Sequence, residues 1–65
     1  MFPDRLAELR SDAGLTQQAV ADILHMRRDV YRRYEKGIYE LPVWALIQLA
    51  KLYGTSTDHI LELDA

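Results

Sequence analysis

Cysteine is absent from this chain of 65 residues, and only three glycines and two prolines interrupt it. Without cysteine the protein has no disulfide framework, no zinc–thiolate site and no thiol nucleophile, and it fits a reducing, cytoplasmic compartment. The two histidines, His25 and His59, lie too far apart in the sequence to suggest a metal site. We therefore expect no metal and no other cofactor.

Long hydrophobic runs are missing as well. No run approaches the roughly 20 residues that a membrane span requires, and no apolar signal core follows the N-terminal Met-Phe-Pro-Asp-Arg segment. We expect no membrane association. The length allows one domain, residues 1–65, which suits either a whole protein or the N-terminal head of a longer one.

Positive charge is in slight deficit, with a net charge of −2, and this argues against a nucleic-acid partner. The basic residues are unevenly placed, however. Five of the eight lie within ten consecutive positions: Arg27, Arg28, Arg32, Arg33 and Lys36. With Asp29 and Glu35 this window carries a net charge of +3, whereas residues 58–65 carry −3. The sequence predicts a local basic patch on an acidic body.

Apolar residues recur with helical spacing throughout, and no segment alternates with period two for long enough to form a strand. We expect an all-α, compact bundle of five short helices at about residues 3–13, 16–24, 28–35 and 42–53, with a last helix opened by Ser56 or Thr57. Gly14, Gly37 and Gly54 end three of these segments. The expected inward-facing residues are Phe2, Leu6, Leu9, Val20, Ile23, Leu24, Tyr31, Tyr34, Val43, Leu46, Ala50 and Tyr53.

Two of these helices, joined by a tight turn over about residues 16–35, form a helix-turn-helix, with Thr16 as N-cap of the first. The accompanying motifs are Leu15-Thr16-Gln17-Gln18, Ala21, Arg33-Tyr34-Glu35-Lys36-Gly37, Leu49-Ala50-Lys51 and Gly54-Thr55-Ser56-Thr57-Asp58. Together they resemble the phage Cro/C1-repressor (Xre-type) helix-turn-helix family over roughly residues 4–61. The resemblance implies a lambda-repressor-like DNA-binding domain.

A recognition helix presents long hydrogen-bonding side chains from its first turns to the major groove. Arginine binds guanine O6 and N7, and an aspartate accepts from cytosine N4 or orients an arginine. The residues expected to contact bases are Arg28, Asp29, Arg32 and Arg33, and the resemblance implies that positions 28, 29 and 33 face base edges. It also implies phosphate contacts at the start of the second helix, where free amides favour anions. The residues expected to contact phosphate are Thr16, Gln17, Arg27, Lys36 and Gly37.

The resemblance implies that Arg10 and Glu35 form an ion pair between the first and third helices. It also implies close helix packing at Ala21. The sequence departs from the family pattern at four positions: His25 replaces the usual turn glycine, Arg27 the usual serine cap, Val30 a threonine or serine, and Tyr31 an isoleucine. Histidine tolerates positive φ, Arg27 cannot cap the third helix and so puts its start in question by one residue, and a buried Tyr31 hydroxyl needs a partner.

The arginine cluster could also be a solvated helix face, but the helix-turn-helix spacing favours DNA contact. Helical spacing places Tyr31, Tyr34 and Tyr53 in the core. Tyr39 and His59 are expected to be exposed. Trp44 is expected to be partly exposed, either packing over Tyr39 or marking a protein contact.

We expect sequence-specific binding of double-stranded DNA by a transcriptional regulator, a repressor of phage or bacterial type. One recognition helix covers few base pairs, so we expect a homodimer, formed at least on DNA, on a pseudo-palindromic operator with half-sites about 34 Å apart. The expected surface for a second copy or another protein is Tyr39, Trp44, Thr55 and His59. The alternative is a protein-interaction module of antitoxin or anti-repressor type. No enzyme is expected, because no nucleophile–base pair, carboxylate dyad or phosphate loop is visible.

Overall fold

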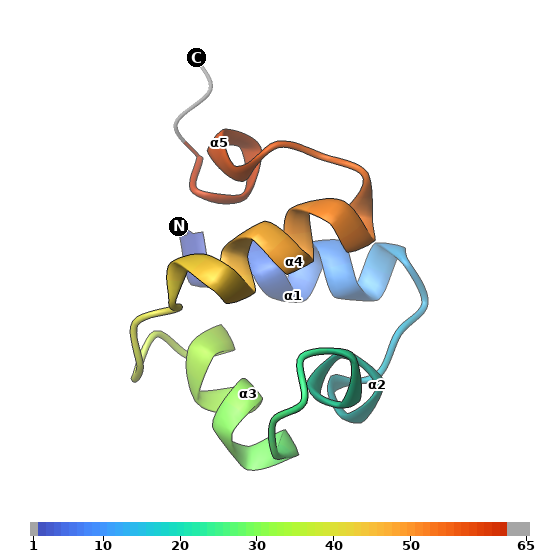
Figure 1. Ribbon diagram of the computed structural model, residues 1–65, viewed down its shortest axis with the longest axis vertical. Helices are drawn as coiled ribbons and strands as arrows, with labels where there is room; N and C mark the ends of the chain where they lie inside the picture. Colours follow the sequence, from blue (N-terminus) through green and yellow to red (C-terminus); the bar gives the residue numbers. More distant parts are fainter. Residues whose placement is uncertain (1, 63–65) are drawn as a thin grey trace.

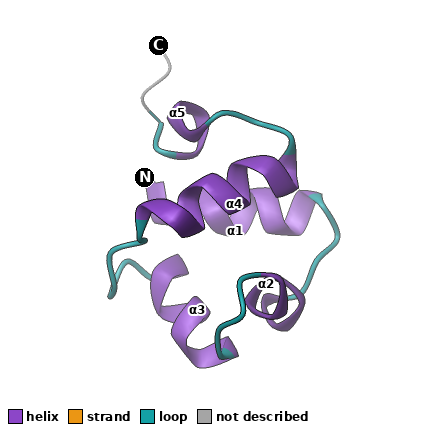
Figure 2. Ribbon diagram, viewed as in Figure 1, coloured by secondary structure: helices purple, strands orange, loops and turns teal. Residues whose placement is uncertain are grey.

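Five helices make up the fold (Figures 1 and 2). A computed structural model describes the backbone of residues 2–62 and the side chains from Asp4 to Glu62. The helices are α1 (Phe2–Asp12), α2 (Gln17–Ile23), α3 (Arg28–Glu35), α4 (Val43–Tyr53) and α5 (Thr57–Ile60). Residues 2–62 contain no strand, which confirms the all-α prediction. None of these helices has the length and apolar character of a segment that crosses a bilayer.

Helices α1 and α4 occupy the middle of the molecule, with α4 crossing in front of α1 in Figure 1. Helices α2 and α3 lie on one side of this pair and α5 on the other. Helix α1 contacts both α3 and α5, while α2 packs on α3. All five helices contribute to one core, whose buried apolar residues are Leu6, Val20, Ala21, Leu24, Tyr31, Ala45, Leu49, Ala50 and Ile60. The small Ala21 is completely buried, as close packing of α2 requires.

The helix ends follow the caps that the sequence indicates. The Thr16 hydroxyl accepts a hydrogen bond from the amide of Ala19 at 3.0 Å, and the Ser56 hydroxyl accepts one from the amide of His59 at 3.0 Å. Each satisfies an amide that the helix itself leaves without an acceptor. Arg27 provides no side-chain cap, yet α3 begins at Arg28 as the spacing predicted.

The turn between α2 and α3 confirms the prediction for His25, which adopts φ of 56°. Its amide donates to the carbonyl of Asp22 at 3.1 Å, and the amide of Met26 donates to the carbonyl of Ala21 at 2.9 Å. These two hydrogen bonds form a Schellman motif, which needs a left-handed residue at the position of His25. The histidine thus takes a place that glycine usually fills, at a cost in local strain.

For two residues the prediction that they face inward is wrong. Val43 is 70% exposed and Ile23 is 43% exposed. Helix α4 has apolar residues on nearly all sides, and packing on its neighbours selects the side that carries Ala45 and Leu49, which turns Val43 outward. In α2 the buried side carries Val20 and Ala21, and Ile23 lies outside it. The side chain of Phe2, also predicted to face inward, lies outside the described residues.

Candidate nucleic-acid interface

One side of α3, continued by its C-cap, carries all four residues predicted to contact bases and one of the five predicted to contact phosphate. Arg28, Arg32 and Lys36 follow one another at intervals of four, and Asp29 and Arg33 form the neighbouring row. We call these five residues the α3 basic face. The other side of the helix is directed to the core through Tyr31 and Glu35, which are buried. Tyr34 is half-buried against the same core.

Three cations of the α3 basic face are free to meet a ligand. Arg28, Arg32 and Lys36 are exposed, and none of them forms an ion pair or a side-chain hydrogen bond with another residue between Asp4 and Glu62. Like charges four positions apart on a helix are destabilising. The row therefore weakens the isolated helix, and an anionic ligand would offset this cost.

Arg33 is held in place by its neighbours. Its Nη1 lies 3.3 Å from the hydroxyl of Tyr39, and its guanidinium carbon lies 5.5 Å from the centre of the Tyr39 ring. Tyr39 in turn packs edge-on against Tyr34, with ring centres 5.9 Å apart. Asp29 Oδ2 lies 3.8 Å from the same Nη1. Residue spacing does not predict the Arg33–Tyr39 contact, because this contact depends on how the loop after α3 folds back.

Asp29 lies between two arginines. In addition to Arg33, Oδ1 of Asp29 lies 3.6 Å from Nε of Arg27. Both separations are long for charge-assisted hydrogen bonds, and all three side chains are substantially exposed. Asp29 can therefore either orient an arginine or turn away to accept from a base, the two roles that the sequence left open.

The start of α2 lies beside Arg28. A shallow, open depression there is lined by Arg10, Leu15, Thr16, Gln17, Gln18 and Arg28. It brings a residue predicted to contact bases next to two residues predicted to contact phosphate. Arg27 lies at the N-terminal end of α3, whereas Lys36 and Gly37 lie at its other end. The predicted contacts therefore lie at the start of α2 and along α3 from its N-cap to the residue after its C-cap.

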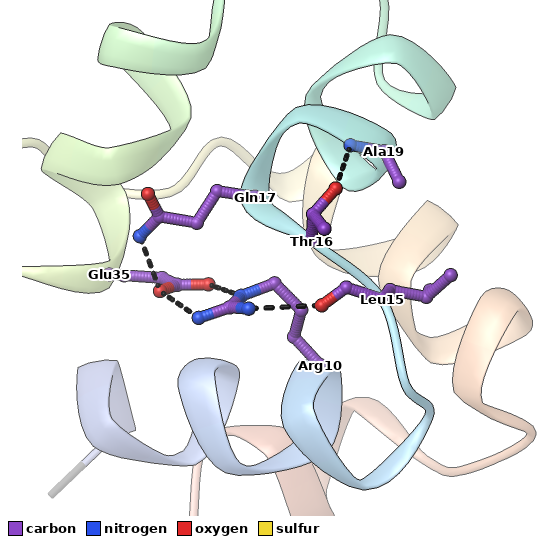
Figure 3. A network of polar contacts seen from close by, with 6 residues as sticks. All are labelled: Arg10, Leu15, Thr16, Gln17, Ala19 and Glu35. Carbon is purple, nitrogen blue, oxygen red and sulfur yellow. Dashed lines mark hydrogen bonds and ion pairs between the residues drawn. The ribbon is translucent and has the colours of Figure 1, made fainter.

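The side chain of Gln17 points inward (Figure 3). Its Nε2 donates to Oε1 of Glu35 at 3.0 Å. This bond commits one of the two side-chain amide hydrogens to the network, and the backbone amide of Gln17 at the start of α2 is the other donor that a phosphate could use. The hydroxyl of Thr16 is engaged as an acceptor in the N-cap but keeps its own proton for donation. Sequence reasoning missed the Gln17–Glu35 hydrogen bond, because the two residues are related only by the packing of α2 on α3.

Arg10 and Glu35 form the ion pair that the resemblance implies (Figure 3). Arg10 Nε donates to Glu35 Oε2 at 2.7 Å and Nη2 donates to Oε1 at 3.3 Å. Arg10 Nη1 also donates to the carbonyl of Leu15 at 3.0 Å. With Gln17, this network joins α1, α2 and α3, and it fixes how α3 is presented.

The network changes the acidity of its members. Burial by itself would raise the pKa of the Glu35 carboxyl, but hydrogen bonds from donors that include Arg10 and Gln17 outweigh it, and the pKa is lowered from its ordinary value. The hydrogen bond to Glu35 raises the pKa of Arg10. Both side chains are thus charged over a wide pH range, and the pair stays closed.

Two buried tyrosine hydroxyls lie near this network but form no hydrogen bond with it. Those of Tyr31 and Tyr53 are buried and form no hydrogen bond with a residue that the structure describes, although the Tyr31 hydroxyl faces Glu35. Burial raises the pKa of both tyrosines. The prediction that Tyr31 lies in the core is confirmed, but the expected partner for its hydroxyl is missing among these residues.

The predicted partner surface is divided by the fold. Tyr39 and Trp44 are exposed, by 44% and 53%. The prediction that His59 is exposed is wrong, because α5 packs on α1 and the half-buried ring lies against Arg5, whose Nη1 is 2.9 Å from Nε2 of His59. Thr55 is half-buried in the turn that precedes α5. Thr55 and His59 therefore form part of the internal packing more than of an open surface.

The chain matches a family model described as a helix-turn-helix domain over residues 2–63, and it belongs to that family. It is 39% identical over 62 residues to the SPbeta prophage-derived uncharacterized HTH-type transcriptional regulator YonR of Bacillus subtilis, covering 95% of this chain and 57% of that protein. It is 35% identical over 60 residues to the HTH-type transcriptional regulator ImmR of the same organism, covering 92% of this chain and 47% of that protein.

A third relative is the cryptic phage CTXphi transcriptional repressor RstR of Vibrio cholerae, 33% identical over 54 residues, covering 83% of this chain and 49% of that protein. The chain thus spans about half the length of the curated relatives it matches. No solved structure matches significantly. The resemblance to the Cro/C1-repressor (Xre-type) family is confirmed, and these relatives are named as transcriptional regulators and not as enzymes.

Proposed function

We propose that this chain is a sequence-specific double-stranded DNA-binding domain that places α3 in the major groove and acts as a transcriptional repressor. The observation that carries the proposal is the α3 basic face, where Arg28, Arg32 and Lys36 project from one helix side without a partner among the described residues. Arginine is the commonest specific reader of guanine in the major groove. The repressor role is supported by the name of the relative RstR.

In this proposal, different residues of the α3 basic face contact base edges and phosphates. Arg28, Asp29, Arg32 and Arg33 contact base edges. Phosphate contacts come from the surfaces at either end, which are Thr16, the backbone amide of Gln17, Arg27, Lys36 and Gly37. The Arg10–Glu35 pair is structural and holds α3 at the angle that the groove requires. Two copies bind one pseudo-palindromic operator, because one helix specifies too few base pairs to select a genomic site.

The proposal is tested by selecting bound duplexes from a random pool and titrating the selected sequence at several salt concentrations. We expect a sequence with two related half-sites and a loss of affinity on the order of 10³-fold between about 50 and 200 mM salt, because many phosphates are neutralised. A protein-interaction module on the same fold would enrich no duplex. Failure to enrich any sequence, with intact folding, would overturn the proposal.

A further inference from the structure

Arg33 differs from the other two arginines of α3 that are proposed to contact bases. Arg28 and Arg32 form no ion pair or side-chain hydrogen bond with a residue that the structure describes. Arg33, by contrast, contacts both Tyr39 and Asp29. A long side chain that is already restrained loses less conformational freedom when it binds a ligand. The contacts of Arg33 therefore affect how selectively it can bind a base.

Both partners engage the same nitrogen of Arg33. Its Nη1 donates a long hydrogen bond to the Tyr39 hydroxyl at 3.3 Å, and Oδ2 of Asp29 lies 3.8 Å from the same Nη1. Neither Nε nor Nη2 of Arg33 donates a hydrogen bond to a residue between positions 4 and 62. These two nitrogens form another edge of the planar guanidinium, with two parallel N–H groups. Bidentate binding of guanine O6 and N7 requires such an edge.

Tyr39 is itself held in place by the turn that ends α3. The amide of Gly37 donates to the carbonyl of Tyr34 at 3.2 Å, and the amide of Ile38 donates to the carbonyl of Arg33 at 2.9 Å. Together they form a Schellman motif, in which Gly37 supplies the left-handed residue with φ of 75°. The ring of Tyr39 then packs edge-on against Tyr34, with ring centres 5.9 Å apart. Because Tyr34 packs against the core, Tyr39 is tied to the body of the fold.

The ring of Tyr39 makes a second contact with Arg33. The guanidinium carbon of Arg33 lies 5.5 Å from the ring centre, which is within the range of a cation–π interaction. The hydroxyl and the ring can be removed separately, because phenylalanine keeps the ring and lacks the acceptor, whereas leucine lacks both. The two contributions can therefore be measured one at a time.

We propose that Tyr39 is a positioning residue for base readout, acting through Arg33. It holds Nη1 from the side of the fold and leaves the Nε–Nη2 edge set for one base, and it does not contact that base itself. This inference rests on the proposed function and extends the residues that determine specificity from α3 to the loop that follows it. The preference for one base pair should then depend on a residue outside the recognition helix.

The proposal is tested by titrating Tyr39 variants against the selected operator and its single-base variants. The base pair read by Arg33 is the one whose preference Arg33→Ala abolishes. At that base pair we expect Tyr39→Phe to reduce the preference roughly threefold and Tyr39→Leu roughly tenfold, because Arg33 must be ordered on binding. The base pair read by Arg28 is the internal control, and its preference should stay unchanged. Equal losses at both base pairs would assign Tyr39 a merely structural role and overturn the proposal.

A double-mutant comparison separates positioning from direct contact. In the Arg33→Ala background, Tyr39→Leu should cause no further loss of preference, because its effect passes through Arg33. A uniform loss of affinity on every duplex would instead mean that the Tyr39 hydroxyl contacts phosphate, and the proposal would be wrong. Unchanged preference in Tyr39→Leu, while the parent chain still reads the operator, would refute the positioning role and leave the proposed function intact.

The restraint on Arg33 is also measurable in the free chain. Nitrogen relaxation of the arginine Nε–H groups should show smaller picosecond-to-nanosecond motion for Arg33 than for Arg28, and Tyr39→Leu should make the two alike. Equal mobility in the parent chain would overturn the proposal. If the parent enriches no duplex, the proposed function fails and the readout role of Tyr39 fails with it, but this measurement still decides whether Tyr39 restrains Arg33.

Discussion

The outward sides of α3 and α4 share one geometry and differ entirely in chemistry. On α3 the rows are Arg28–Arg32–Lys36 and Asp29–Arg33, and on α4 they are Val43–Ile47–Lys51 and Trp44–Gln48. Each row repeats every four residues on a helix that packs its other side on the core. The surface of α3 lowers folding stability because like charges lie next to one another. The surface of α4 is unfavourable because it exposes apolar area to water. An anionic ligand would offset the first cost, and an apolar partner would offset the second.

The two helices are also held in the fold by different interactions. Helix α3 has a single apolar side and is fixed further by the Arg10–Glu35–Gln17 network. Helix α4 has no such network among the described residues and relies on the apolar residues Ala45, Leu49 and Ala50. Charge thus helps to position the helix that is proposed to read DNA, while apolar packing positions α4.

The largest expected effect compares the two sides of α4. Leu49→Ala removes a fully buried side chain and should lower the free energy of unfolding by about 2–5 kcal/mol. Val43→Ala removes a side chain that is 70% exposed and should cost less than about 0.5 kcal/mol. Urea denaturation of the free chain at low concentration measures both. Similar losses would mean that Val43 is part of the core after all.

The Glu35 carboxylate gives the next largest effect. Glu35→Ala strands the Arg10 guanidinium and should cost about 2 kcal/mol, less than for a fully buried pair because Arg10 is 20% exposed. DNA affinity should fall mainly through this loss of folded protein. An unchanged melting temperature together with lost binding would assign Glu35 to DNA contact instead.

The same residue makes stability depend on pH. The pKa of Glu35 is lowered in the folded chain, so its stabilisation is complete above the unfolded pKa of roughly 4.3 and is lost as pH falls through the lower folded pKa. Glu35→Gln should therefore differ from the parent at neutral pH and converge with it in acid. The control Glu8→Gln, on a side chain 67% exposed, should change the free energy of unfolding at neutral pH much less than Glu35→Gln does.

These contrasts explain which parts of the fold were predictable from sequence. On α3, polar residues occupy one side, so periodicity alone identified Tyr31 as core and Arg28 as outward. On α4, only Gln48 and Lys51 are polar, so several apolar rows fit equally well and Val43 was placed on the wrong side. The helix ends were predictable because Thr16, Ser56 and His25 act through local backbone geometry. In the site, Gln17–Glu35 and Arg33–Tyr39 depend on packing between elements, which no spacing encodes.

The next prediction concerns which arginines of the α3 basic face read base pairs. Arg28→Ala should lower affinity for the selected operator by about 1–3 kcal/mol and relax the preference at one base pair. Arg33→Ala should act similarly, with added loss of the contact to Tyr39. Arg27→Ala is the matched control, expected to weaken all sequences alike and to reduce the salt slope. Binding assays on the operator and on its single-base variants distinguish these outcomes, and parent-like affinity of both readout variants would refute the assignment.

The smallest expected effect is the loss of folding stability that the like charges of the α3 basic face cause in the free protein. Arg32 lies four positions from both Arg28 and Lys36, and each like-charge pair of this kind destabilises a helix by about 0.2–0.5 kcal/mol. Arg32→Gln removes both pairs but also a cation that favours the C-terminal end of the helix. The net gain should therefore be about 0.3 kcal/mol, or roughly 2 °C in melting temperature, with weaker DNA binding. Gln48→Ala, in the corresponding outward position of α4, should change neither quantity measurably. A loss of stability in Arg32→Gln at low salt would show that Arg32 contributes to the fold, and the α3 basic face would then no longer be explained by its ligand alone.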